Sequence, residues 1–309
     1  MSTRDENARG WRIAVAFLAV YVVWGSTYLA IRVAIETLPP FLMAATRFLT
    51  AGVLIYGLGR LGGGARPTLH EWRGSAVLGG LFLLVGNGGV VWAEAHGVPS
   101  GLAALLVATT PLWTVLFEWR AGGAPPDLGT AAGLVIGLGG VALLVAPGSI
   151  IGPGTVDLRG AAGCLIASFS WSFASVHSLK RRLPRSPAIA SSLQMLAGGA
   201  LLAAAGIVLG EGRSAVPGAV SLRSLLALGY LILFGSLVTF TAFTWLLRVS
   251  TPSRVATCAY VNPVVAVLLG WGLAGERLTV RSLVAAAIIL GAVVLITTTR
   301  TRQKSGGGP

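Results

Sequence analysis

Long apolar runs recur along the chain, and most of them last about 20 residues, which is the length of an α-helix that crosses the hydrocarbon layer. They do not alternate apolar and polar residues in segments of about 10, as the strands of a membrane barrel would. The pattern therefore predicts ten transmembrane helices, at residues 13–34, 41–60, 74–94, 100–119, 128–146, 159–179, 188–209, 222–246, 252–272 and 281–299.

The composition agrees with a membrane protein. Of the 309 residues, 54% are hydrophobic and only 11% are charged, and the mean hydropathy is +0.80. Soluble domains carry about 25% charged residues, so an ordinary soluble enzyme is excluded. The net charge of +13 indicates contact with membrane lipid rather than nucleic acid, because basic residues collect in the cytoplasmic loops of membrane proteins. Cys164 and Cys258 lie in apolar runs with no metal-binding spacing, so no cofactor or metal is predicted.

The distribution of basic residues predicts the orientation. With the N-terminus inside, 16 of the 23 Lys and Arg residues fall in inner segments and 7 in outer segments. Basic residues favour the cytoplasmic side, and an even number of spans returns the chain to the side on which it started. Both termini are therefore predicted to be cytoplasmic, and the polar tails 1–12 and 300–309 are expected to be disordered.

The two halves of the chain resemble each other. A shift of 147 residues places Trp24 on Trp171 and Gly52 on Gly199, and a later shift of 152 places Pro111 on Pro263 and Gly139 on Gly291. Five spans per half is an odd number, so the halves must enter the membrane in opposite senses, an arrangement common among transporters. The prediction is an all-α integral membrane protein with a tail at 1–12, repeats at 13–146 and 159–299, and a tail at 300–309.

Several short motifs resemble the EamA family of the drug/metabolite transporter superfamily. They are Val23-Trp24-Gly25-Ser26-Thr27-Tyr28, Ala45-Thr46-Arg47-Phe48, Gly101-Leu102-Ala103-Ala104-Leu105-Leu106 with Thr110-Pro111, and Tyr260-Val261-Asn262-Pro263 followed by Gly275-Glu276-Arg277-Leu278. The resemblance covers residues 11–299. It implies ten helices in two inverted halves, and export of amino acids, related metabolites or drugs across the bacterial inner membrane. Aromatic-amino-acid exporters and threonine/homoserine exporters are the natural comparisons.

Two tryptophans mark a candidate substrate site. Trp24 and Trp171 lie about ten residues into their spans, which is the bilayer midplane at a rise of about 1.5 Å per residue. We interpret them as aromatic walls that face each other across a pocket, although they would also fill space between helices. Ser26, Thr27 and Tyr28, and Ser175 in the second half, are further candidates for substrate contact. Small hydroxyl residues also join helices to one another, and that alternative stays open.

Prolines interrupt two spans near their middle. Pro111 and Pro263 each remove a backbone N–H, and we interpret them as symmetric hinges, with a purely structural kink as the alternative. The polar or aromatic residues near these prolines that we expect to contact substrate are Thr110, Trp113, Tyr260 and Asn262. Asn87, deep in the third span, is a further cavity candidate because strongly polar side chains are rare at such depth.

Charged residues are expected to lie away from the pocket. No Asp or Glu falls at the midplane, so uniport or exchange is favoured over coupling through a buried acid. Arg47 is expected near the outer boundary, either paired with Glu94 or extended toward water. The predicted pocket is aromatic and neutral, and it suits a small zwitterion with an apolar or aromatic side chain, or an amphipathic drug.

The predicted function is export of small metabolites by alternating access through a cavity between the repeats. The alternative is an integral membrane enzyme or a flippase acting on lipid-linked substrates, but no HExxH, GxSxG or Walker motif occurs. A non-enzymatic protein is therefore predicted. A channel would require a ring of like residues, which the sequence does not indicate. Whether the protein is a monomer or a homodimer stays open.

Overall fold

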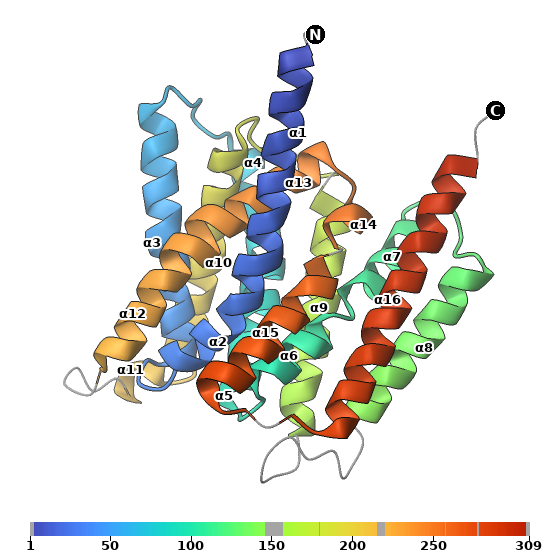
Figure 1. Ribbon diagram of the computed structural model, residues 1–309. Helices are drawn as coiled ribbons and strands as arrows, with labels where there is room; N and C mark the ends of the chain where they lie inside the picture. The colour runs from blue at the N-terminus through green and yellow to red at the C-terminus, as the bar shows by residue number, and fades with distance from the viewer. Residues whose placement is uncertain are drawn as a thin grey trace.

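The protein is a bundle of helices (Figure 1). The computed structural model describes residues 3–145, 157–178, 180–214, 220–256, 258–276 and 278–306, and no strand occurs among them. The helices are α1 (Thr3–Leu18), η1 (Ala19–Val23), α2 (Trp24–Ala34), α3 (Pro40–Leu61), α4 (Leu69–Gly79), η2 (Gly80–Asn87), α5 (Gly88–Ala95), α6 (Ser100–Val107), α7 (Thr110–Arg120), α8 (Leu128–Val145), α9 (Leu158–Ser178), α10 (Pro187–Val208), α11 (Glu211–Ser214), α12 (Leu222–Tyr230), η4 (Leu231–Phe240), α13 (Thr241–Val249), α14 (Pro252–Val255), α15 (Cys258–Ala274) and α16 (Val280–Gly306).

The helical stretches follow the apolar runs of the sequence. Six are long and apolar enough to cross a membrane by length and composition: Gly10–Ala34, Pro40–Leu61, Leu69–Ala95, Ser100–Arg120, Pro187–Val208 and Leu222–Val249. Shorter apolar helices occur at Leu128–Leu143, Val261–Ala274 and Leu283–Ile296. The expected sixth span corresponds to α9, whose serines make it more polar. The all-α membrane fold is confirmed, and the count of ten crossings stays a prediction.

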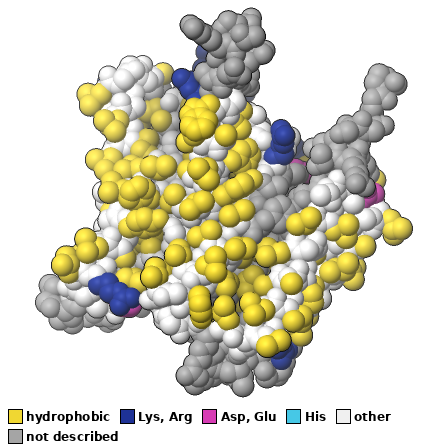
Figure 2. Space-filling model, viewed as in Figure 1, with side chains coloured by type: hydrophobic (Ala, Val, Ile, Leu, Met, Phe, Trp, Pro, Cys, Tyr) yellow, Lys and Arg dark blue, Asp and Glu magenta, His cyan; other side chains and the backbone are white. Residues whose placement is uncertain are grey.

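The outer surface of the bundle is apolar. Large side chains such as Leu58, Val135, Val208 and Trp271 are exposed. Figure 2 shows apolar side chains spread over the visible face, with Lys and Arg near its upper and lower margins. This distribution is the one expected where lipid tails contact the middle of the protein and water contacts its ends.

Both ends of the described chain lie at the same end of the bundle (Figure 1). The expected disorder of the tails is wrong for the described part, because α1 begins at Thr3 and α16 continues to Gly306. A helix satisfies its own backbone hydrogen bonds, so it continues beyond the apolar run into polar sequence. Figure 1 also shows α1 and α9 beginning at opposite ends of the bundle, as an inverted repeat requires.

Reciprocal contacts relate the two halves. Gly52 of α3 packs against Leu196 of α10, and Gly199 of α10 packs against Leu49 of α3. A Cβ atom added to Gly52 would lie 3.0 Å from Cγ of Leu196, and one added to Gly199 would lie 2.9 Å from Cγ of Leu49. Both residues of the first contact map onto the second by the shift of 147. A contact that is repeated with its partners exchanged is the mark of a two-fold axis, and here the axis relates the two halves of one chain.

The pair α8 and α16 repeats this relation at one side of the bundle (Figure 1). Gly140 packs against Ile289, and Gly137 packs against Ala292, which are equivalent contacts under the shift of 152. The two-repeat arrangement is confirmed by these contacts. The repeat boundaries at 13–146 and 159–299 stay a prediction.

Candidate functional site: a cavity between the two halves

A cavity of about 100 Å³ lies where the two halves meet. Its walls come from both halves. The first half contributes the stretches Gly10–Ala34, Leu69–Ala95 and Ser100–Arg120 and helix α3, and the second half contributes α9, the stretch Leu222–Val249 and α15. The lining residues are Trp24, Thr27, Tyr28, Ile31, Arg47, Phe48, Leu83, Gly86, Asn87, Val90, Ala104, Val107, Ala108, Thr110, Ala167, Trp171, Gly235, Phe240, Cys258, Ala259, Asn262 and Pro263. Among the described side chains, α8, α10 and α16 contribute no lining residue.

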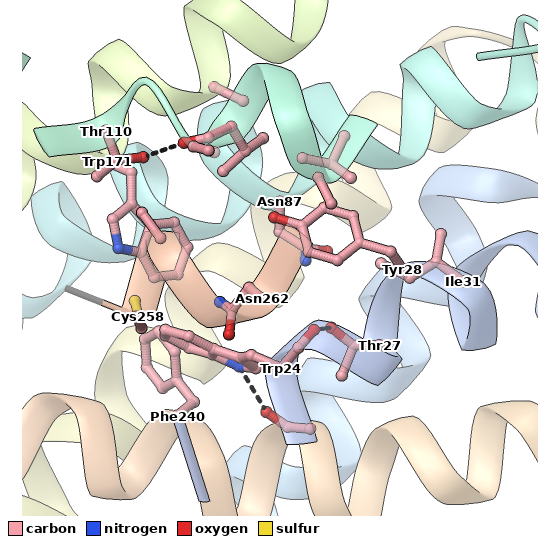
Figure 3. A pocket seen from close by; sticks show the side chains of 18 of the residues that line it. Trp24, Thr27, Tyr28, Ile31, Asn87, Thr110, Trp171, Phe240, Cys258 and Asn262 are labelled. Atoms are coloured by element: carbon pink, nitrogen blue, oxygen red, sulfur yellow. Dashed lines mark hydrogen bonds between the residues drawn. The ribbon is translucent and has the colours of Figure 1, made fainter. Parts of the chain in front are cut away.

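Trp24 and Trp171 both line the cavity, but they do not face each other across it. Their rings meet edge to face, with centroids 5.3 Å apart and an interplanar angle of 84°. Because the two residues are equivalent under the shift of 147, this contact lies on the axis that relates the halves. Figure 3 shows both rings with Phe240 beside Asn262 and Cys258. The expected pair of opposed walls is wrong, since the two rings form one continuous wall.

This aromatic wall closes one end of the cavity. Phe243 contacts both Trp24 and Trp171, at centroid distances of 4.9 and 5.3 Å, and Phe82 contacts Trp171 at 4.8 Å. Phe82 and Phe243 are closer along their helices to the end of the bundle where both termini lie. The aromatic cluster of Trp24, Phe82, Trp171, Phe240 and Phe243 therefore separates the cavity from that end.

Polar groups interrupt the apolar lining. Trp24 donates a long hydrogen bond of 3.4 Å from its indole Nε1 to the carbonyl of Gly235. Thr27 and Thr110 donate to carbonyl oxygens three residues earlier in their own chain, so their hydroxyls are already satisfied. The side-chain oxygen of Asn87 is buried without a partner. Asn262, once its amide is oriented to fit its neighbours, donates to the carbonyl of Tyr21 at 2.7 Å.

Local irregularities in the helices accompany the cavity. Three π-helical stretches, η1, η2 and η4, precede or contain lining residues. A π-helical turn holds an extra residue and widens the helix, and such turns are frequent at functional sites. Gly86, Gly88 and Gly89 around Asn87 are a weak indication of such local bending in η2 and α5. The stretch α6–α7 is broken at Ala108 and Thr109, so Pro111 lies in the first turn of α7, whereas Pro263 lies inside α15.

Several predicted site residues lie elsewhere. The hydroxyl of Ser26 lies 2.6 Å from that of Tyr230, and Ser175 donates to the carbonyl of Trp171, so both join helices or helix turns.

Trp113 donates from its Nε1 to the hydroxyl of Ser168 at 3.1 Å and lines a separate surface groove with Phe117 and Phe169. Pro111 is buried beside the helix break but does not line the cavity. The side chain of Tyr260 lies outside the described residues.

Arg47 was misplaced by the sequence argument. It is 2% exposed and lines the cavity, and its Nε donates to the hydroxyl of Ser236 at 2.8 Å. Neither of the expected alternatives holds, because Arg47 does not extend to water and the carboxylate oxygens of Glu94 are buried without a partner. The cavity is therefore not neutral. The position of Arg47 well inside the apolar run 41–60 was the available signal, since charges at such depth are usually functional.

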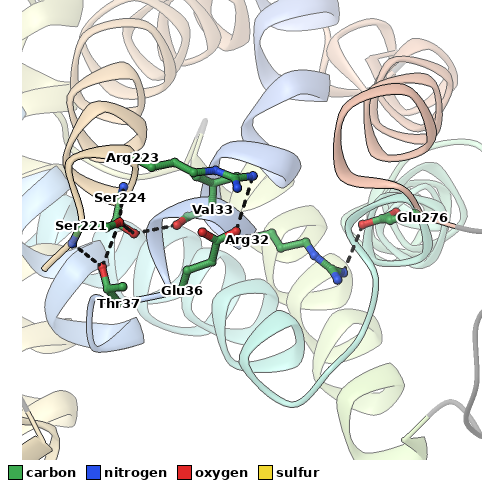
Figure 4. Close-up of polar contacts among 8 residues, drawn as sticks. All are labelled: Arg32, Val33, Glu36, Thr37, Ser221, Arg223, Ser224 and Glu276. Atoms are coloured by element: carbon green, nitrogen blue, oxygen red, sulfur yellow. Dashed lines mark hydrogen bonds and ion pairs between the residues drawn. The ribbon is translucent and has the colours of Figure 1, made fainter. Parts of the chain in front are cut away.

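The end of the bundle away from the termini is held by polar contacts (Figure 4). Arg32 of α2 pairs with Glu276 at 3.2 Å, and Glu276 also accepts hydrogen bonds from the backbone of Ser100 and Gly101 at the start of α6. On the other side of α2, Arg223 of α12 lies 3.6 Å from Glu36. These contacts join the first half to the second at the end opposite the aromatic cluster.

Two inverted repeats around a cavity, within an apolar surface, define a multi-pass membrane transporter. The model of the EamA-like transporter family matches residues 11–146 and again residues 158–298. The chain therefore belongs to the EamA-like transporter family. This membership and its apolar helices place it in the inner membrane.

Individual relatives agree over nearly the whole chain. The uncharacterized inner membrane transporter YedA of Escherichia coli is 43% identical over 282 residues, covering 91% of this chain and 89% of YedA. A probable amino-acid metabolite efflux pump of Salmonella typhimurium is 27% identical over 290 residues, and the matched region covers 90% of this chain and 92% of the pump. One crystal structure matches with a TM-score of 0.66 at 22% identity over 93% of this chain and 98% of that chain, which supports the fold alone.

Proposed function

We propose that this chain exports small metabolites across the inner membrane, most simply amino acids with apolar or aromatic side chains or amphipathic drugs, by alternating access through the cavity between its repeats. The observation that carries the proposal is the cavity itself, which is lined by both halves and has an aromatic wall on the axis that relates them. The Salmonella relative, named for amino-acid metabolites, supports the substrate class.

The two ends of the cavity are the proposed gates. The aromatic cluster blocks the end toward the termini, and the contacts of Arg32, Glu276, Glu36 and Arg223 join the halves at the other end. With the predicted cytoplasmic termini, the aromatic cluster is the inner barrier. Rocking of one half against the other would separate the rings of Trp24 and Trp171, because these rings belong to different halves.

The helix break before Pro111 and the interior Pro263 are the proposed hinges. A helix interrupted at Ala108 and Thr109 lacks part of its hydrogen-bond ladder, so it bends there at lower cost than a continuous helix. Thr110 and Pro263 both line the cavity. Bending at these positions would therefore change the shape of the cavity.

Counterflow in proteoliposomes tests the function. Vesicles containing the purified chain are loaded with one unlabelled amino acid or drug and given the same labelled compound outside, with and without a pH gradient. We expect saturable uptake of labelled apolar or aromatic amino acids that does not require the gradient. Absence of counterflow for every amino acid and drug tested, from vesicles containing folded protein, would contradict the proposal, and ohmic conductance would indicate a channel instead.

A further inference from the structure

We propose that Arg47 binds the carboxylate group of the transported molecule, so that the cavity selects carboxylates and zwitterions and discriminates against amphipathic cations. This inference rests on the proposed function and narrows its substrate class. It begins from the position of one side chain, which is buried in the protein and lines the cavity at the same time.

The hydrogen-bonding capacity of Arg47 is largely unused. A guanidinium group has five N–H donors in a planar fork. Its Nε donates to the hydroxyl of Ser236 at 2.8 Å, whereas its Nη1 is buried without any partner. The hydrogen bond from Nε and the ring of Phe48, 4.6 Å from the guanidinium carbon, fix the group in place. A buried donor without a partner costs free energy, and a ligand oxygen would remove that cost.

The charge of Arg47 also has no counter-ion in the part of the chain that the structure describes. No acidic residue lines the cavity among the described residues. The ion pairs Arg32–Glu276 and Arg223–Glu36 do not involve Arg47. A cation is expensive to keep inside the membrane unless an anion or another partner compensates it. The carboxylate group of a bound substrate would supply that anion.

The rest of the cavity defines the molecule that carries the carboxylate. The rings of Trp24, Trp171 and Phe240 suit an apolar or aromatic body. The buried side-chain oxygen of Asn87 lacks a donor, and an ammonium group would supply one. An unpaired donor and an unpaired acceptor on one cavity are complementary to the two charged ends of a zwitterion.

The site is single, although the fold is a repeat. The shift of 147 places Arg47 on Gln194, which is neutral and does not line the cavity. One half therefore supplies the charge, and one carboxylate is bound at a time. The planar fork of arginine matches a carboxylate through two parallel hydrogen bonds, which a lysine does not reproduce.

The first test uses the natural chain and four matched probes: phenylalanine, 3-phenylpropanoate, 3-phenylpropanamide and phenethylamine. Binding is measured by the shift in melting temperature of the purified protein, and transport by counterflow. We expect the two carboxylates to bind about tenfold or more tightly than the amide, because a charged hydrogen bond is lost with the amide, and phenethylamine to bind weakest. Equal affinity for carboxylate and amide, or preferred binding of the amine, would overturn the role of Arg47, and the proposed transport function would still stand.

The second test uses Arg47→Lys and Arg47→Gln, with Arg159→Gln at an exposed position as the matched control. We expect both Arg47 variants to raise the KM for phenylalanine about tenfold or more, with Gln worse than Lys, and to abolish the preference for 3-phenylpropanoate over its amide. The control variant is expected to keep the natural KM for phenylalanine and the natural preference for 3-phenylpropanoate over its amide. Folded Arg47 variants that retain the preference would contradict the role. If no probe shows counterflow in the natural chain, the proposed function fails instead.

Discussion

At the residue scale, the cavity depends on side chains whose contacts join the two halves. Trp24 illustrates this, because its ring contacts Trp171 and Phe243, while its indole nitrogen donates a hydrogen bond to the carbonyl of Gly235. The indole N–H of a tryptophan at this depth therefore has its hydrogen-bond acceptor in the opposite half of the protein. The same ring therefore serves as part of the cavity wall and as part of the proposed gate.

Replacement of Trp24 tests this double role. Trp24→Ala removes a ring on which the aromatic side chain of phenylalanine would pack, a contact worth about 0.5–1.5 kcal/mol, so we expect the affinity for phenylalanine in counterflow to fall by about threefold to tenfold. Trp24→Phe keeps a ring and should lose less. Trp119→Ala, at a position 42% exposed, is the control and should transport normally. Unchanged kinetics in folded Trp24→Ala protein would rule out the aromatic wall as a substrate contact.

The sequence located some of the residues that line the cavity and missed others, for physical reasons, and contact of any of them with substrate stays a prediction. Depth along a helix can be counted, so Trp24, Trp171 and Asn87 were correctly assigned to the cavity. The direction in which a side chain points cannot be counted once π-helical stretches shift the register. Ser26 consequently contacts Tyr230 rather than the cavity. Arg47 was missed because charge was assumed to stay near water.

At the element scale, small residues set the spacing of the helices. In membranes, close approach through glycine supports helix association where lipid gives no hydrophobic driving force between helices. The pair α3–α10 uses Gly52 and Gly199 in reciprocal contacts. Hydropathy predicted these helices with bounds close to those observed, but the partner of each helix became visible only in the structure.

Enlarging Gly52 tests the packing of α3 against α10. A Cβ at this position would already lie 3.0 Å from Leu196, so Gly52→Val should destabilise the protein by about 1–3 kcal/mol through overpacking. Gly57→Val is the matched control, since Gly57 lies on the same helix with nothing within 4 Å. Thermal melting in detergent measures both. Equal melting temperatures would show that α3 and α10 do not pack as described.

The break before Pro111 is a second element-scale feature. In Pro111→Ala, the new N–H is free to donate to the carbonyl of Val107, which now accepts from the hydroxyl of Thr110. We expect a more continuous helix, an unchanged or slightly raised melting temperature, and exchange slowed several-fold. Pro125→Ala, in the loop between α7 and α8, is the control. A Pro111→Ala protein that exchanges at the natural rate would remove the hinge from the account.

At the scale of the whole molecule, the internal two-fold axis organises the function. The peripheral pairs α3–α10 and α8–α16 repeat their contacts with partners exchanged, and the Trp24–Trp171 contact lies on the axis between them. The sequence predicted this symmetry because matched residues recur at a nearly constant shift. It could not predict the asymmetry of the cavity, where Arg47 has a neutral equivalent that points elsewhere.

A transported molecule that occupies the cavity between the halves should shield Cys258 from a thiol reagent. Cys258 lines the cavity, whereas Cys164 is fully buried, so a Cys164→Ala chain carries one thiol. The measurement is its rate of alkylation by N-ethylmaleimide with increasing phenylalanine or another transported compound. A control thiol is introduced by Thr46→Cys at an exposed position of α3, in a chain that also carries Cys258→Ala.

We expect a transported compound to slow the alkylation of Cys258, with half-maximal protection near its KM for counterflow, and to leave the control thiol unaffected. A compound that is transported at saturating concentration while Cys258 reacts at the same rate as in its absence would contradict the account.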